Sequence, residues 1–264
     1  MGGSALLEDE NRMEALQLAG QIIIENGGET YRAEETICRM GDGFGLKEVE
    51  SFAVPSGLFI SYRAEDGHLE TSVRRVHRQG THLTRIDMAN QVSRQAAGGG
   101  LKPGEALARL LRIQQMRGPV SPALSPLAAG LCAGGFSVLF GGGLPEILAS
   151  FLIAALVHLI SLATAFFHDH GIASNILGGL ATSLLVSLAR LVFPALQPEI
   201  TVASALMPMV PGLAMTNAVQ DTLRGDMVSG LSYAAQALLT ACLIAGGALV
   251  APYLMQLITG GMGG

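Results

Sequence analysis

The sequence has 264 residues, of which 50% are hydrophobic and only 14% charged, and its mean hydropathy is +0.44. Soluble domains carry about 25% charged residues, so this composition disfavours a purely soluble protein and favours a membrane protein. The net charge of -5 gives no indication of nucleic-acid binding.

The charges divide the chain into two parts. Fourteen of the 16 lysines and arginines and 16 of the 21 acids lie at or before Arg117. We therefore expect a soluble region, residues 1–117, followed by a membrane region, residues 118–264. The amino terminus is acidic and lacks the apolar core of a signal peptide, so we expect residues 1–117 to be cytoplasmic. Cys38, Cys132 and Cys242 are far apart and are expected to be reduced.

The first part predicts a compact α+β domain with the order ααβββαα. Helical periodicity covers residues 13–26, and Thr30 can cap a second helix that ends near residues 41–45. Three short strands follow, with a turn at Glu65-Asp66-Gly67 between the second and third. Two further helices are expected over residues 82–96 and 103–116, the second with Pro103 in its first turn.

Catalytic and metal-binding patterns are missing from this part. It contains no GxSxG, HExxH, P-loop or GxGxxG motif, so we expect no enzyme activity and no cofactor. The basic run Arg74, Arg75 and Arg78 can meet lipid headgroups or an anionic substrate, but a solvated strand end is favoured. In the second part, His168-Asp169-His170 lacks further ligands at zinc-like spacing, so a hydrated loop is favoured over a metal site.

The second part predicts five membrane spans, at about residues 124–140, 147–167, 172–190, 202–219 and 231–254. Basic residues just before the first span place that end in the cytoplasm. Small residues at helical spacing, such as Gly130 with Gly134, favour close packing of helices in lipid. His158, alone in the second span, is expected to form a hydrogen bond with a neighbouring helix.

The fourth span is interrupted, and it is the main candidate for a transport path. Pro208 and Pro211 each remove a backbone donor, and Gly212 follows at once. Interrupted apolar segments of this kind point to a substrate site in transporters, although a proline kink can also merely shape the bundle. Asn217 and Asp221 lie on the second half of the segment. Asp221 is either a coupling or substrate-contacting acid or a hydrated group at the membrane boundary.

The last span carries polar residues on one stripe, namely Tyr233, Gln236 and Thr240. This stripe either lines a polar path, with Gln236 and Thr240 in it, or forms ordinary hydrogen bonds between helices.

Three motifs resemble the threonine/serine exporter family, and most closely the large subunit of its two-component succinate exporters. They are LAGQIIIENGGETYRAEETICRM at residues 18–40, VESFAVPSGLFISY at residues 49–62, and MPMVPGLAMTNAVQDTLRGDMVSGLSYA at residues 207–234. With the order of a soluble domain before five spans, the resemblance covers nearly the whole chain. The positions that carry over are Pro208, Pro211, Gly212, Asn217 and Asp221, together with Gly28, Glu29, Arg32 and Glu34, to which no role is assigned.

The resemblance implies a subunit of a secondary active exporter in the inner membrane. The implied substrate is a small carboxylate metabolite, either a succinate-like dicarboxylate or threonine or serine, and the implied driving force is an ion gradient. The split form of the family also implies a small, hydrophobic partner subunit. The alternative is a membrane-anchored cytoplasmic enzyme or sensor domain.

Overall fold

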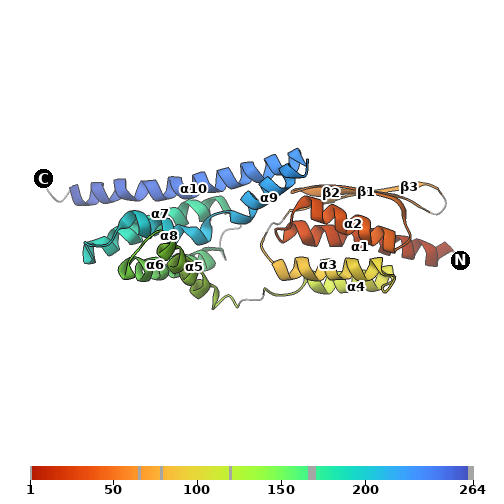
Figure 1. The fold of residues 1–264 in the computed structure, drawn as a ribbon, viewed down its shortest axis with the longest axis horizontal. Helices are drawn as coiled ribbons and strands as arrows, with labels where there is room; N and C mark the ends of the chain where they lie inside the picture. Colours follow the sequence, from red (N-terminus) through yellow and green to blue (C-terminus); the bar gives the residue numbers. More distant parts are fainter. Residues whose placement is uncertain (1, 65–66, 78–79, 119–120, 166–170, 261–264) are drawn as a thin grey trace. The chain divides into compact units, whose positions relative to one another are not determined.

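The computed structural model describes residues 2–64, 67–77, 80–118, 121–165 and 171–260 (Figure 1). Two expectations, the Glu65-Asp66 part of the hairpin turn and the loop His168-Asp169-His170, lie outside the described residues. The chain folds as two compact units. The first contains Met1–Pro119 and Leu213–Ala235, and the second contains Val120–Gly212 and Gln236–Gly264. The first unit thus includes a segment that lies far beyond the composition boundary at residue 117.

The amino-terminal part of the first unit has the predicted order of elements. Its helices and strands are α1 (Gly2–Glu25), α2 (Thr30–Gly43), β1 (Lys47–Val54), β2 (Gly57–Arg63), β3 (Leu69–Arg75), α3 (Leu83–Ala97) and α4 (Pro103–Gln114). α1 begins well before the apolar stripe that predicts it, because residues 5–14 are mostly good helix formers. Pro103 occupies the first turn of α4, as predicted.

The three strands form an antiparallel sheet in the order β1-β2-β3. Alternate residues of β2 point to opposite faces, so Leu58, Ile60 and Tyr62 are buried while Phe59 is exposed. α1 and α2 pack on the buried face, and α3 and α4 pack on the side of α1 and α2 that is turned away from the sheet (Figure 1). The core of this unit therefore lies around α1 and α2.

The turn between α1 and α2 is tight and closely packed. Gly27 has φ +90, a conformation that side chains rarely adopt. The amide of Gly28 donates to the carbonyl of Ile23 at 2.9 Å, and a Cβ atom at Gly28 would come within 2.5 Å of Ile23 Cγ2. The two glycines of the first motif are therefore required by the backbone of this turn.

The second unit is helical. It contains α5 (Ser125–Leu139), α6 (Leu144–Ala165), α7 (Gly171–Val192), α8 (Pro198–Leu206), the 3-10 helix η1 (Met207–Met209) and the greater part of α10 (Met227–Gly260). Between η1 and α10 the chain forms α9 (Gly212–Leu223), which lies in the first unit from Leu213 onward.

By length and composition, the described helices provide three candidate membrane spans, or four if the interrupted pair counts as one. Leu144–Leu162, Gly171–Val192 and Met227–Ala251 are long and apolar enough, and Pro198–Met209 with Gly212–Leu223 forms a bent pair. The first of the five expected spans corresponds to α5, which has 15 residues. Because a straight span needs about 20 residues, the length of α5 does not confirm a fifth span.

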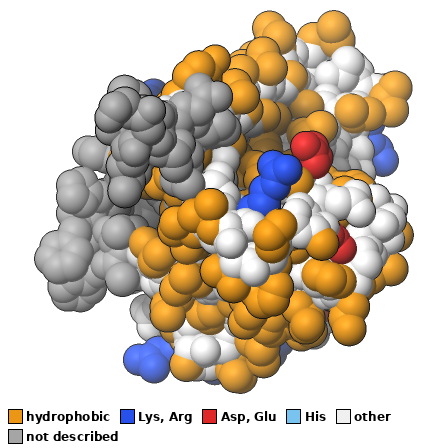
Figure 2. Space-filling view, turned by 90° about the vertical axis from the view of Figure 1, so that its left-hand side faces the viewer, with side chains coloured by type: hydrophobic (Ala, Val, Ile, Leu, Met, Phe, Trp, Pro, Cys, Tyr) orange, Lys and Arg blue, Asp and Glu red, His pale blue; other side chains and the backbone are white. Residues whose placement is uncertain are grey.

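The outside of the helical unit is apolar. Leu131, Leu139 and Leu191 are each at least 64% exposed. Hydrophobic side chains also dominate the face in Figure 2, which shows only a few charged ones. A soluble protein rarely exposes so large an apolar surface, whereas lipid covers it without cost, so this part of the chain is a membrane domain.

Glycines allow the helices of this unit to approach closely. A Cβ atom at Gly130 of α5 would come within 2.8 Å of the carbonyl oxygen of Phe151 in α6. At Gly179 of α7 and Gly247 of α10, the added Cβ would lie 2.1 Å from the carbonyl oxygens of Ile244 and Ile176, respectively. α7 and α10 therefore touch through their backbones, as small residues permit in lipid.

Candidate functional site

The predicted interruption of the fourth apolar segment is present. α8 ends at Leu206, η1 contains Pro208, and α9 begins at Gly212. Between them Val210 is extended, with φ -62 and ψ 132, and the amide of Gly212 donates to its carbonyl at 2.8 Å. Two prolines three positions apart thus end one helix and separate it from the next.

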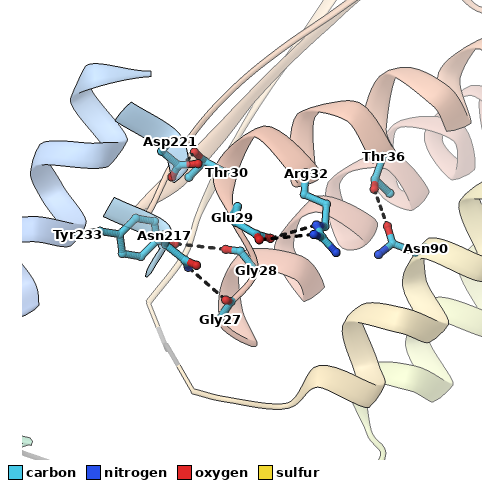
Figure 3. A network of polar contacts seen from close by, with 10 residues as sticks. All are labelled: Gly27, Gly28, Glu29, Thr30, Arg32, Thr36, Asn90, Asn217, Asp221 and Tyr233. Atoms are coloured by element: carbon cyan, nitrogen blue, oxygen red, sulfur yellow. Dashed lines mark hydrogen bonds and ion pairs between the residues drawn. The ribbon is translucent and has the colours of Figure 1, made fainter. Parts of the chain in front are cut away.

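α9 presents polar residues of the third motif to the turn of the first motif. Asn217 and Asp221 are four residues apart, so they lie on one helical face, and they are 3% and 0% exposed. The side-chain amide of Asn217 donates to the carbonyl of Gly27 at 3.1 Å (Figure 3). Tyr233 of α10 donates its hydroxyl to the neighbouring carbonyl of Gly28 at 3.4 Å.

Thr30 connects two aspartates. Its Oγ1 lies 2.9 Å from Asp221 Oδ2 and 3.0 Å from Asp226 Oδ2. A hydroxyl has one hydrogen, so it can donate to only one of these oxygens at a time. The second contact is favourable only when a carboxyl group carries a proton and donates it to the hydroxyl oxygen. With both carboxylates ionised, the Thr30 hydroxyl can therefore satisfy only one of the two oxygens that it contacts.

Asp221 and Asp226 differ in their surroundings. Asp226 is partly exposed, and its Oδ1 accepts from the amide of Ser229 at 3.1 Å, which caps the start of α10. Asp221 is fully buried, and its Oδ1 has no hydrogen-bond partner among the described residues. Its carboxyl group interacts with the amides of Thr30 and Tyr31 at the first turn of α2. An ionised Asp221 would be costly without a cation, and none of the described residues forms an ion pair with it.

Glu34 adds a third acid to this group. It lies one turn after Thr30 on α2, and its Oε1 accepts from the amide of Ala53 at 2.7 Å. Burial raises the pKa of Glu34, and the nearby charges of Asp226 and Asp221 raise it further, while the Ala53 bond opposes the shift. Ser229 connects Asp226 with Ala53, because its amide donates to Asp226 and its hydroxyl donates to the carbonyl of Ala53 at 3.2 Å.

Glu29 and Arg32 form a separate charged pair at the start of α2. Arg32 Nε lies 3.0 Å from Glu29 Oε2, and the arginine side chain remains 41% exposed. One turn farther along, Thr36 donates to the side-chain oxygen of Asn90 on α3 at 3.0 Å (Figure 3).

The structure brings together six of the residues singled out from the sequence. These are Gly28, Glu29, Arg32, Glu34, Asn217 and Asp221, all in the first unit. Pro208, Gln236 and Thr240 belong to the second unit, where Thr240 is half-buried and Gln236 is exposed. Pro211 lies between η1 and α9, and Gly212 is the first residue of α9.

The second unit has a cavity of its own, of about 270 Å³, between α6, α7, α8 and η1. Pro208 and Met209 line it, together with mainly apolar side chains. His158, which also lines it, lies 3.1 Å from the Ser125 hydroxyl of α5 through Nε2. The expected hydrogen bond of His158 to a neighbouring helix is thereby confirmed.

Glu146 at the start of α6 has a capping role. Its two carboxylate oxygens accept from the amides of Gly143 at 2.9 Å and Gln197 at 3.1 Å. The described residues contain no group of three or more His, Cys, Asp or Glu side chains arranged to hold a metal ion.

Sequence reasoning missed the role of Thr30. The sequence predicts Thr30 as the cap of α2, but Glu29 precedes the helix, and the Thr30 hydroxyl contacts Asp221 and Asp226 instead. Asp226 and Tyr233 were also not predicted as site residues, although both belong to the third motif. The only signal was that the first and third motifs carry the resemblance together, which is compatible with a contact between them.

The comparisons with known proteins cover both motifs. The model of the family described as "Putative threonine/serine exporter" matches residues 14–255. Two similar proteins are each named "Probable succinate transporter subunit YjjP". The one from Escherichia coli (strain K12) is 27% identical over 224 residues, 84% of this chain and 86% of its own. The one from Klebsiella aerogenes is 26% identical over 220 residues, 83% of this chain and 84% of its own. No solved structure matches the chain.

Proposed function

Because the chain belongs to the threonine/serine exporter family, we propose that it is a subunit of a secondary active exporter of small carboxylate metabolites in the inner membrane. The substrate is a succinate-like dicarboxylate or a small amino acid such as threonine or serine. The chain has no catalytic role in this proposal, and residues 1–117 face the cytoplasm.

The observation that carries the proposal is the burial of Asp221 of α9, whose carboxyl group contacts Thr30 at the start of α2. A carboxyl group that is fully buried, faces a hydroxyl and a second aspartate, and lacks a cation holds a proton readily. Ionisable groups close to membrane spans often form proton relays in transporters. Asp221 is therefore proposed as the residue that binds the coupling proton.

Loss of the proton supplies the conformational step. When both aspartates are ionised, Thr30 can donate to only one of them, and the carboxylate oxygen of the other faces the hydroxyl oxygen with no hydrogen between the two. The contact of α9 with α2 is then weakened. Because α9 directly follows the break at Pro208, Pro211 and Gly212, this weakening can reach the proposed transport path, in which Gln236 and Thr240 also lie.

A small hydrophobic membrane protein is proposed as the partner. The similar proteins from E. coli and K. aerogenes are named as transporter subunits, and this chain covers more than four fifths of each. A chain of the same extent is therefore proposed to work as one subunit of a two-component exporter.

The proposal is tested by efflux from vesicles that are preloaded with labelled succinate, threonine or serine. We expect efflux from vesicles that contain this chain together with a small hydrophobic partner, and none from vesicles with either protein alone. Efflux from this chain alone would contradict the two-component arrangement. Absence of efflux for every substrate, with both proteins correctly inserted, would contradict the exporter function.

A further inference from the structure

The first unit contains a polar cavity of about 300 Å³ beside the α1–α2 turn. It lies between the start of α2, the first half of α3 and the first half of α9. Its charged lining residues are Glu29, Arg32 and Asp87, and its side-chain amides come from Asn90 and Asn217. Its volume is near the lower end of the range found for small-molecule sites.

Arg32 can bind an anion without losing its partner. Glu29 is contacted by Nε at 3.0 Å and by Nη2 at 3.4 Å. A guanidinium group has five N–H donors, so donors remain for a further acceptor. Because 41% of the side chain is exposed, a ligand in the cavity can reach these donors. A carboxylate matches the planar geometry of the guanidinium group.

Asp87 provides the opposite charge on α3. Its carboxylate is exposed and accepts from Gln91 at 2.8 Å, a bond that leaves further lone pairs for another donor. Asn90, one turn along α3, uses its side-chain oxygen for Thr36 and keeps its amide hydrogens for another acceptor. The cavity thus offers donors at Arg32 and Asn90 and an acceptor at Asp87.

The charge balance of the lining selects among carboxylate ligands. One arginine and two acids give a net charge of 1 - 2 = -1. A dicarboxylate would meet one cation that is already paired with Glu29, together with the uncompensated charge of Asp87. A molecule with one carboxylate and one ammonium group would place each charge beside its opposite.

We propose that this cavity binds a small zwitterion, whose carboxylate pairs with Arg32 and whose ammonium group pairs with Asp87. The inference rests on the proposed export function and places a substrate site in the first unit. The 270 Å³ cavity of the helical unit is a poorer candidate for a charged ligand, because its described lining contains no Asp, Glu, Lys or Arg.

Calorimetric titration of the purified full chain tests the site with three probes, namely L-serine, glycerate and succinate. Glycerate is serine with a hydroxyl in place of the ammonium group. We expect serine to bind at least about tenfold more tightly than glycerate or succinate, the size of effect that one lost charge pair gives. Asp87→Asn should remove the preference for serine over glycerate. Arg32→Gln should abolish binding, and Arg32→Lys should weaken it.

Arg39→Gln is the matched control, because Arg39 also lies on α2 and pairs with an acid of its own helix, Glu35, but does not line the cavity. Its serine affinity should equal that of the unmodified chain. Thermal melting verifies that each variant is folded. Equal binding of serine and glycerate, tightest binding of succinate, unchanged affinity in Arg32→Gln, or no binding by the folded chain would each overturn the site. Vesicle efflux by the unmodified chain with its partner shows separately whether the export function holds.

Discussion

Thr30 and Asp221 are 191 positions apart in the chain, yet Thr30 Oγ1 lies 2.9 Å from Asp221 Oδ2 in the interior of one compact unit. This contact joins the amino-terminal helix pair to the segment that follows the proline break. Asp221 is fully buried at this contact.

Thr30→Val tests the contact energetically. Valine has nearly the same shape as threonine but no hydroxyl, so neither Asp221 nor Asp226 can accept a hydrogen bond from this position, while Asp221 stays buried. We expect a loss of about 1–3 kcal/mol in the free energy of unfolding, the cost of a buried polar group without its partner. Denaturant unfolding in detergent measures it. Thr30→Ser keeps the hydroxyl and should be clearly less destabilising; equal losses would mean that the hydroxyl contributes little.

Asp226 is expected to tolerate replacement by asparagine. Its Oδ1 caps α10 through the Ser229 amide, and an asparagine oxygen caps a helix equally well. Asp226→Asn should therefore leave the unfolding free energy nearly unchanged, whereas Asp226→Ala should lower it by about 1 kcal/mol. Denaturant unfolding in detergent measures the difference between the two variants. A large loss in the asparagine variant would show that the charge of Asp226, and not its cap, stabilises the unit.

Glu34 should make the stability of the first unit depend on pH. Its pKa in the folded chain is raised above the ordinary value of 4.5, mainly by burial, so the folded state binds a proton more tightly than the unfolded state does. The free energy of unfolding should therefore fall as the pH rises above about 4.5, until the folded pKa is passed.

Glu34→Gln should reduce this decrease in the free energy of unfolding, because glutamine cannot ionise. Its side-chain oxygen can still accept from the amide of Ala53. Unfolding measured at several pH values between 4 and 8 tests the difference. The neighbouring exposed acid gives a control. Glu35→Gln removes only a surface ion pair with Arg39, so the free energy of unfolding should still decrease as the pH rises. If the free energy of unfolding depends on pH with the same slope in the Glu34→Gln and unmodified chains, Glu34 is not the source of the pH dependence.

Gly246 and Gly247 form a matched pair on α10. A Cβ atom at Gly247 would lie 2.1 Å from the carbonyl oxygen of Ile176, while one at Gly246 would meet nothing within 4 Å. We expect Gly247→Ala to lower the melting temperature, at a cost of about 1–3 kcal/mol for an overpacked contact. Gly246→Ala should have no effect or stabilise the helix. Equal melting temperatures for the two variants would argue against the backbone contact of α7 with α10.

The sequence was sufficient to predict the features of the fold that local chemistry determines. Pro103 marked the start of α4, the alternation of Leu58, Ile60 and Tyr62 marked a half-buried strand, and Pro208 and Pro211 marked the break. α5 shows the limit of hydropathy: its residues are apolar enough for a span, but its helix has only 15 residues. The helix ends at Leu139, shortly before Gly141, which has φ +81.

The candidate site depends on contacts that periodicity does not encode. Thr30 has the local sequence of a helix cap. Its hydroxyl contacts Asp221 and Asp226 only because α9 and the residues that follow it approach the start of α2. Likewise, Asp87 is an ordinary surface residue of α3 until α2 and α9 bring Arg32 and Asn217 beside it. The resemblance to an exporter family drew attention to both motifs, but the contact between them could be seen only in the fold.

The central claim, that Asp221 binds the coupling proton, is tested most directly by Asp221→Asn in vesicles with the partner subunit. Internal pH and labelled substrate are followed together. Asparagine mimics the protonated acid and can still contact Thr30, so assembly should be intact, while substrate efflux driven by a proton gradient should be lost and proton movement with it. Gradient-driven efflux at the rate of the unmodified chain would contradict the account and remove Asp221 from the mechanism.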